Sequence, residues 1–124
     1  MTAADTPQPM PETTRPKRRA TYLHVSQAQM LRDWGRQVRA SFAHEMPYLV
    51  GSAVTGPGWR DVDVRLILDD VTFASLAAIL DVNRLNLAMS LWGQQATGLP
   101  IDFQVQSMTD ANSIDGPRHP IGMS

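Results

Sequence analysis

The sequence contains no cysteine, and none of its apolar stretches approaches the length needed to cross a lipid bilayer. Without cysteine the chain forms neither disulfide bonds nor thiolate metal sites. The polar start, MTAADTPQPMPETT, is unlike a secretory signal peptide, so we expect a cytoplasmic protein without a membrane partner. The 124 residues are 43% hydrophobic, which is enough for the core of one small domain.

The sequence also lacks a strong net charge. Its formal net charge is −1, so the chain has no overall attraction to nucleic acid. The charges are nevertheless unevenly distributed. Residues 1–60 contain eight Lys and Arg against four Asp and Glu, whereas residues 61–124 contain three against eight. The first part of the chain is therefore positively charged and the second part negatively charged.

Residues 1–22 are predicted to be a disordered basic arm. Residues 1–20 hold four prolines and almost no large apolar side chain, so they cannot bury enough surface to offset their ordering entropy. The arm either contacts the phosphates of RNA or DNA or serves only as a solubilising tail. Its positive charge comes from Arg15, Lys17, Arg18 and Arg19.

Residues 23–110 are expected to form the folded domain, which begins with a helix. Ser26 is a suitable N-cap, and Pro47 ends the helix at or before Met46. The helix has an apolar stripe and, beside it, a stripe of arginines that is either a solvated face or a binding surface. The apolar stripe consists of Leu31, Trp34, Val38 and Phe42, and the other stripe of Arg32, Arg36 and Arg39.

Three later segments have the pattern of β-strands. Residues 48–51 form a short apolar run, and residues 61–68 and 101–106 alternate between two kinds of side chain. Each of the longer strands has an apolar face that helices must cover and a face that bears aspartate. The sequence therefore predicts an α+β fold, with a mixed β-sheet and helices packed mainly on one face.

Two helices are expected between the second and third strands. The first runs from a cap at Thr72 to Leu80, and the second begins at Asp81 or Asn83 and ends before Gly98. After residue 106 the sequence shows no periodicity. Residues 111–124 are accordingly predicted to be a C-terminal loop and tail.

Asp61 and Asp63 stand at the head of the second predicted strand. Because side chains alternate along a strand, their carboxylates point the same way, roughly 6 to 7 Å apart. Asp102 has the matching position on the last strand, so three carboxylates converge if the two strands are neighbours. Mg²⁺ or Mn²⁺, which take oxygen ligands, would relieve their repulsion. Solvated strand residues without a ligand are the alternative.

Gly51 and Ser52 follow the first strand and form a candidate phosphate site. Glycine lets the backbone approach a phosphate closely, and exposed N–H groups and the serine hydroxyl can bind its oxygens. Arg60 and Arg65, beside the two aspartates, could neutralise the charge of a triphosphate. A Gly-Ser pair that only ends a strand is the alternative.

Four further residues are weaker candidates. Trp59 lies in the loop before Asp61 and could stack on a base, although a structural role is equally consistent with the sequence. Asn112, Arg118 and His119 could reach a nucleotide if the C-terminal segment folds back. Otherwise that segment is a surface strap or a free tail.

The segment LVGSAVTGPGWRDVDVRLIL resembles the signature of minimal nucleotidyltransferase domains of the DNA polymerase beta-like superfamily, which include small proteins of bacteria and phages. That signature joins Gly and Gly or Ser, after an apolar residue, to a strand that begins Asp-apolar-Asp. Asp102 in PIDFQV matches its third carboxylate. The resemblance covers about residues 42–106. It departs from the family at Arg60, where serine is frequent, and in the short spacer that follows Ser52.

The resemblance implies metal-dependent transfer of a nucleoside monophosphate from an NTP to an acceptor hydroxyl on an unknown protein, RNA or small molecule. Gly51 and Ser52 would then hold phosphates. Asp61, Asp63 and Asp102 would hold Mg²⁺ or Mn²⁺, with Asp102 nearest the attacking hydroxyl. The alternative is a non-catalytic subunit of the same fold, which binds a second copy, a protein or a nucleic acid, as in a toxin–antitoxin or phage regulatory pair.

Overall fold

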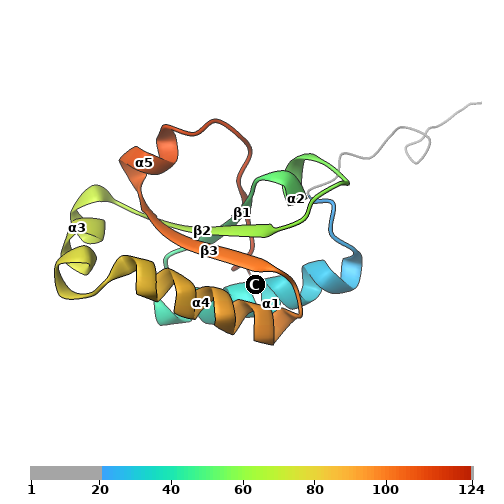
Figure 1. Ribbon diagram of the computed structural model, residues 1–124, viewed down its shortest axis with the longest axis horizontal. Helices are drawn as coiled ribbons and strands as arrows, with labels where there is room; N and C mark the ends of the chain where they lie inside the picture. Colours follow the sequence, from blue (N-terminus) through green and yellow to red (C-terminus); the bar gives the residue numbers. More distant parts are fainter. Residues whose placement is uncertain (1–20, 124) are drawn as a thin grey trace, which may run out of the picture.

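The computed structural model describes residues 21–123, and within them four strands form one mixed β-sheet (Figure 1). The strand order is β3-β2-β1-β4, in which β2 and β3 run parallel and the other neighbours run antiparallel. The strands are β1 (Pro47–Val50), β2 (Val62–Leu68), β3 (Ile101–Ser107) and β4 (His119–Pro120). The three predicted strands are therefore present. Residues 1–20 of the predicted basic arm, which include its four basic side chains, lie outside the described residues. Only its last two residues are described.

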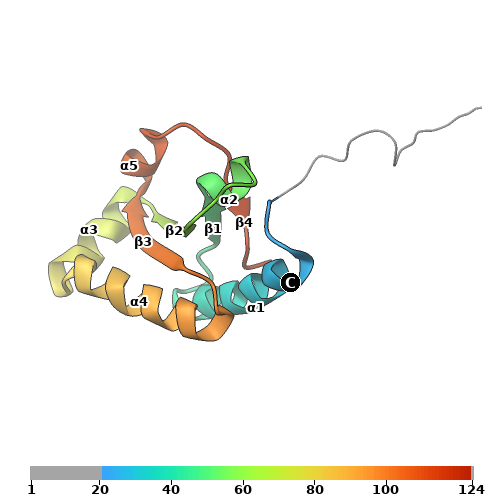
Figure 2. The ribbon, with the colours of Figure 1, turned by 45° about the vertical axis from the view of Figure 1, so that its right-hand side comes forward.

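Helices cover the two faces of the sheet unequally. α1 (Val25–Ser41) and α4 (Val82–Thr97) lie beneath one face, whereas the short α5 (Met108–Asn112) lies above the other (Figures 1 and 2). α3 (Asp70–Ile79) follows β2 at one end of the sheet, and the single turn of α2 (Ser52–Thr55) follows β1 near the other end. The predicted α+β fold, with a mixed sheet and helices mainly on one face, is confirmed.

The core lies between the sheet and the two long helices. Val62, Val64 and Leu66 alternate along β2 and are fully buried, as the period of two predicts. Trp34 of α1 packs edge to face on Phe103 of β3, with ring centroids 6.1 Å apart. The apolar faces of β2 and β3 are thus used for packing, and their polar faces lie on the opposite side of the sheet.

The ends of α3 and α4 agree with the sequence in part. α4 begins after Asp81 and ends at Gly98, which adopts the left-handed conformation with φ 72°, as predicted. The predicted cap of α3 at Thr72 is wrong by three residues, because Asp69 is the N-cap and accepts a hydrogen bond from the Thr72 backbone N–H at 2.8 Å. Both aspartate and threonine cap helices well, so a sequence with two such residues close together leaves the start ambiguous.

α1 differs from the prediction at its start and in the use of its arginines. His24, and not Ser26, is its N-cap. Arg36 and Arg39 donate hydrogen bonds to backbone carbonyls of residues 122–123, at 3.3 and 3.4 Å. Two members of the arginine stripe therefore hold the C-terminal segment of the same chain.

The prediction of a loop and tail for residues 111–124 is wrong in part, because α5 extends to Asn112 and His119–Pro120 form β4. The Ser107 hydroxyl accepts a hydrogen bond from the Asp110 backbone N–H at 3.1 Å and so caps α5. β4 pairs with β1, and the following Ile121 is buried against α1, where a Cβ atom on Gly35 would lie 2.6 Å from the Ile121 carbonyl oxygen. The contacts of β4 and Ile121 are long-range and leave no periodicity in the sequence.

None of the residues of α3 is buried. Its side chains Val71 and Ile79 are 78% and 80% exposed, and residues 71–80 carry no charge. Within the described chain, no single helix has the length and apolar composition to cross a membrane; α3 and α4 meet that criterion only together, as a pair bent by 95°.

Candidate functional site

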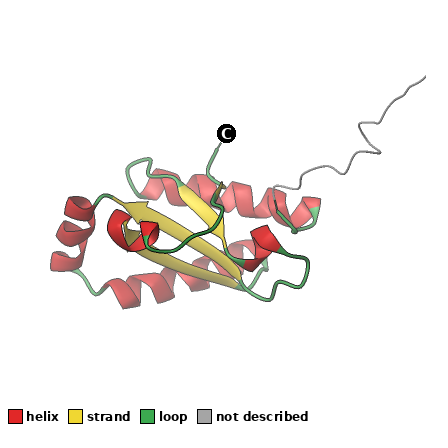
Figure 3. Ribbon diagram, turned by 90° about the horizontal axis from the view of Figure 1, so that it is seen from above, coloured by secondary structure: helices red, strands yellow, loops and turns green. Residues whose placement is uncertain are grey.

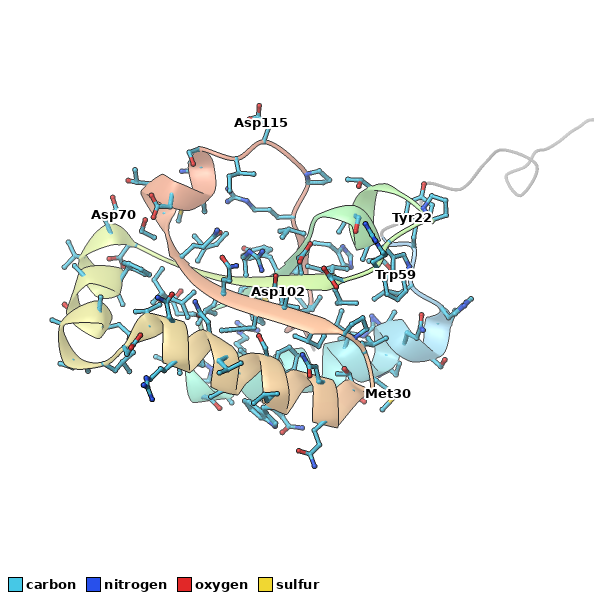
Figure 4. All side chains as sticks on the ribbon, in the orientation of Figure 1. Tyr22, Met30, Trp59, Asp70, Asp102 and Asp115 are labelled. Carbon is cyan, nitrogen blue, oxygen red and sulfur yellow. The ribbon has the colours of Figure 1, made fainter. Side chains whose placement is uncertain are left out.

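Asp63 on β2 and Asp102 on β3 lie opposite each other in the parallel strand pair. Residues opposite each other in a sheet place their side chains on the same face. Both are partly exposed, whereas their chain neighbours Val62 and Ile101 are buried in the core on the other face. The two carboxylates therefore share the polar face of the sheet (Figure 4, which labels Asp102).

Gly51, at the end of β1, brings the backbone against the carboxylate of Asp63. The preceding residue, Val50, is the register partner of Asp63. A Cβ atom on Gly51 would lie 2.4 Å from Asp63 Oδ2, and the φ angle of 75° is one that L-residues rarely adopt. Glycine is thus required at this position for two independent reasons, the close approach and the backbone conformation.

Arg65 lies on the same face, two residues after Asp63. Its Nη2 is 3.9 Å from Asp63 Oδ1. Its Nη1 donates to the carbonyl oxygens of Asp102 and Val64, at 2.9 and 3.0 Å. The guanidinium is consequently fixed between β2 and β3, with its positive charge beside one of the two carboxylates.

The pKa of Asp63 is raised above its ordinary value of 3.8. Partial burial is the largest cause, the nearby charges of Asp102 and Asp61 act in the same direction, and Arg65 opposes them. Burial therefore disfavours the charged form of Asp63 even with Arg65 beside it. A bound cation would favour the ionised form of Asp63.

A cleft of about 320 Å³ lies over this face of the sheet. Its floor includes Asp63, Arg65 and Ile67 of β2, and Gly51 borders one end. Residues 111–118, which we call the strap, form its other wall. Figure 3 shows α5 and the loop after it passing over the strands. The polar face is thus covered in part and does not lie fully open to solvent.

The strap is attached at both ends. At its start, the Thr109 backbone N–H and hydroxyl donate to the carboxylate of Asp70, at the beginning of α3. Within the strap, Arg118 Nη2 donates to the Ala111 carbonyl oxygen at 2.9 Å and to Asn112 Oδ1 at 3.1 Å, which joins the last residue of the strap to its first two. β4 then follows and pairs with β1.

The structure brings four of the predicted site residues together on one face of the sheet. They are Gly51, Asp63, Arg65 and Asp102. The other three are exposed: Ser52 begins α2, and Arg60 and Asp61 precede β2. Asp61 is near enough to act on the charge of Asp63.

Trp59 does not border the cleft. Its Nε1 donates to the Tyr22 carbonyl oxygen at 3.2 Å, and the ring packs on the core, so its contacts are structural (Figure 4). Arg118, by contrast, does border the cleft. No pattern in residues 111–118 indicated that the strap forms a wall of the cleft, because these residues show no periodicity.

Gln104 and Gln106 of β3 also border the cleft, and the sequence interpretation did not assign them to the site. They are register partners of Arg65 and Ile67. The alternation of Asp102, Gln104 and Gln106 on one face was the signal that could have found them.

The donor chemistry of the site suits a divalent metal ion, although the ligands are not in coordinating positions. Carboxylate oxygens are the ligands that Mg²⁺ prefers, and the pKa of Asp63 is raised first by burial and then by the charges of Asp102 and Asp61. Across residues 21–123, no three acidic or histidine side chains stand as a group that could hold a metal ion. Metal binding by Asp61, Asp63 and Asp102 therefore requires their side chains to rotate.

Comparisons with protein-family models, with curated proteins and with solved structures find no match to this chain.

Proposed function

We propose that the protein is a nucleotidyltransferase that binds an NTP where Gly51 meets Asp63 and transfers the nucleoside monophosphate to an acceptor hydroxyl. The proposal is carried by one observation: Gly51 lies against Asp63, which lies opposite Asp102. This contact joins the Gly-Ser turn to two carboxylates from separate strands. The same combination underlies the resemblance to the DNA polymerase beta-like superfamily.

The residues around the contact of Gly51 with Asp63 have separate roles in the proposal. Gly51 admits a phosphate group close to the backbone, and the Ser52 hydroxyl and the exposed Arg60 bind phosphate oxygens. Asp61, Asp63 and Asp102 would hold Mg²⁺ or Mn²⁺. Such an ion, when bound, supplies positive charge to the triphosphate and the leaving pyrophosphate.

The transfer exchanges one phosphorus–oxygen bond for another. A bond forms between the acceptor oxygen and the α-phosphorus, and the bond from that phosphorus to the pyrophosphate oxygen breaks. The proton of the acceptor hydroxyl passes to Asp102 Oδ. Asp102 suits this role because Arg65 binds its backbone carbonyl and leaves its carboxylate free of an ion pair with the described residues.

A second candidate is a non-catalytic subunit that binds a protein partner or a second copy. Two observations favour it. Arg65 lies beside Asp63, where its charge partly takes the place of a cation. α3 is apolar, uncharged from Val71 to Leu80 and without a buried residue, which is typical of a surface that contacts another protein.

Transfer of label distinguishes the two functions. The protein is incubated with each α-labelled NTP, with Mg²⁺ or Mn²⁺, in the presence of bacterial RNA and protein. We expect label in one acceptor class with the wild type and with Asp33→Asn, a surface control on α1, and none with Asp63→Asn. If no NTP labels any acceptor and the protein instead copurifies in a fixed ratio with a partner or as a dimer, the non-catalytic function is correct.

A further inference from the structure

The cleft extends well beyond the residues assigned to phosphate and metal. Along β2 its floor runs from Asp63 to Ile67, a distance of roughly 13 Å at the rise of a β-strand. Gly51 and Asp63 lie at one end. The strap covers the other end, to which no role has been given.

The end beneath the strap combines apolar walls with unused amides. Ile67 on the floor is 8% exposed and Ala111 in the strap is buried, whereas Ile114 borders the cleft and is 63% exposed. Gln104 and Gln106 border the same space, and their side-chain amides form no hydrogen bond with any residue in the described range. Each amide offers two donor hydrogens and one acceptor oxygen.

The charged side chains around this end do not favour a ligand group of either charge. Arg118 and Asp115 have opposite charges. Asp115 lies at the outermost point of the strap and points away from the sheet (Figure 4). The Arg118 guanidinium is also bound to the strap through Ala111 and Asn112. A neutral, flat group with donors and acceptors on its edge fits such a space better than a second phosphate.

We infer that the strap end of the cleft binds the nucleobase of the nucleotide, whose edge Gln104 and Gln106 recognise and whose face packs on Ile67. The inference rests on the proposed function, since it extends the same ligand along the cleft from its phosphates. Glutamine amides form paired hydrogen bonds with base edges, and a good pair discriminates between bases by about 5-fold to 150-fold. Gln104 and Gln106 are accordingly specificity-determining residues, and the protein prefers one base.

A competing location for a ligand is a more open hollow of about 520 Å³, bordered by β3, α3 and α4. Gln104 and Gln106 border it too, together with Ala77 and Leu80, whereas Ile114 borders only the cleft beneath the strap. Variants of Leu80 and Ile114 therefore separate the two locations.

The test measures the two ends of the cleft independently by NMR on the full chain. Inorganic tripolyphosphate with Mg²⁺ probes the phosphate end, with the Gly51 and Ser52 amides as readout. The four nucleosides, which carry no phosphate, probe the strap end, with Ile67 and Ala111 as readout. Gln104→Met removes one amide at similar length, and Gln37→Met on the exposed side of α1 is its control.

We expect one nucleoside to bind at least about fivefold more tightly than the weakest, and Gln104→Met to remove that preference while Gln37→Met keeps it. Ile114→Ala should weaken nucleoside binding and Leu80→Ala should not. Equal or absent binding of the nucleosides, or a preference that survives Gln104→Met or responds to Leu80→Ala, overturns the inference. Failure of tripolyphosphate to bind overturns the phosphate site alone, because the nucleoside readout does not depend on it.

Discussion

The backbone of Gly51 lies so close to the carboxylate of Asp63 that a Cβ atom there would be 2.4 Å from Oδ2. Gly51 ends β1 and Asp63 lies in β2, so this contact joins two strands at the point where a phosphate and a cation would meet. The account of function depends on the geometry of this pair and of Asp102 beside it.

Gly51→Ala should destabilise the protein and displace Asp63. The backbone of Gly51, with φ 75° and ψ −152°, lies in a region that costs an L-residue about 1–3 kcal/mol, and the new methyl group collides with the carboxylate. Chemical denaturation measures the loss of stability. Gly58→Ala, where an added Cβ meets nothing within 4 Å, is the control and should be near neutral. A variant at Gly51 as stable as the control would show that the contact is not as tight as described.

Asp63→Asn should leave the fold intact, with a melting temperature equal to or above that of the wild type. Its pKa is raised because burial and the charges of Asp102 and Asp61 disfavour the ionised form, so neutralising it removes an unfavourable charge. Cation binding should be lost at the same time. A large drop in melting temperature would instead identify the Arg65 ion pair as the main role of Asp63.

Thr109→Val should raise the pKa of Asp70, which is lowered in the native protein first by the Thr109 hydroxyl and then by the Thr109 backbone N–H. A lowered pKa means that the ionised carboxylate stabilises the fold above its ordinary value of 3.8, and that this stabilisation is lost as the pH falls through the native value. Carboxyl NMR titration measures the change.

Asp69 provides an internal control for that titration. Its pKa is also lowered, through hydrogen bonds from Thr72, and Thr109→Val leaves those bonds in place. Equal changes in the pKa of both aspartates in the variant would indicate a general change at the start of α3 and not the loss of a hydrogen bond with α5.

Gly35→Ala should release the C-terminal segment. An added Cβ would lie 2.6 Å from the carbonyl oxygen of Ile121 and 2.8 Å from its carbonyl carbon, and backbone atoms cannot turn aside as a flexible side chain does. Overpacking of this kind costs about 1–3 kcal/mol. Amide hydrogen exchange should accelerate in β4 and in the strap, whereas Gly56→Ala, which meets nothing within 4 Å, should not change it.

The stability of the protein should depend on pH through His119 in β4. Burial and the charge of Arg32 lower its pKa below the ordinary value of 6.5. The unfolded chain therefore binds the proton more readily, and stability should fall as the pH drops below 6.5 towards the native pKa. As the pH is lowered through this range, the melting temperature should fall less in His119→Gln than in the wild type. An unchanged decline would assign it to other groups.

The sequence predicted the parts of the fold that local patterns determine. Alternation in residues 101–106 placed Phe103 in the core and Asp102 on the other face, and the structure agrees. The helix end at Gly98 was predicted for a similar reason, because the left-handed conformation favours glycine. Such features depend on neighbouring residues in the chain.

The parts that were wrong or unassigned depend on distant contacts. The strap is fixed by Asp70 on α3 and by β4 on β1, and the segment after it by Gly35 on α1. Nothing in the composition of residues 111–118 shows these partners. For the same reason the sequence could place Gln104 on a polar face without showing that the strap forms a cleft over that face.

The most direct test of the account is paramagnetic broadening by Mn²⁺ in amide NMR spectra. We predict that traces of Mn²⁺ selectively broaden signals of residues 61–65 and 101–104, that excess Mg²⁺ restores them, and that Asp63→Asn abolishes the effect. Broadening that is absent from these two strands, or that is as strong in Asp63→Asn as in the wild type, would contradict a cation site between Asp63 and Asp102.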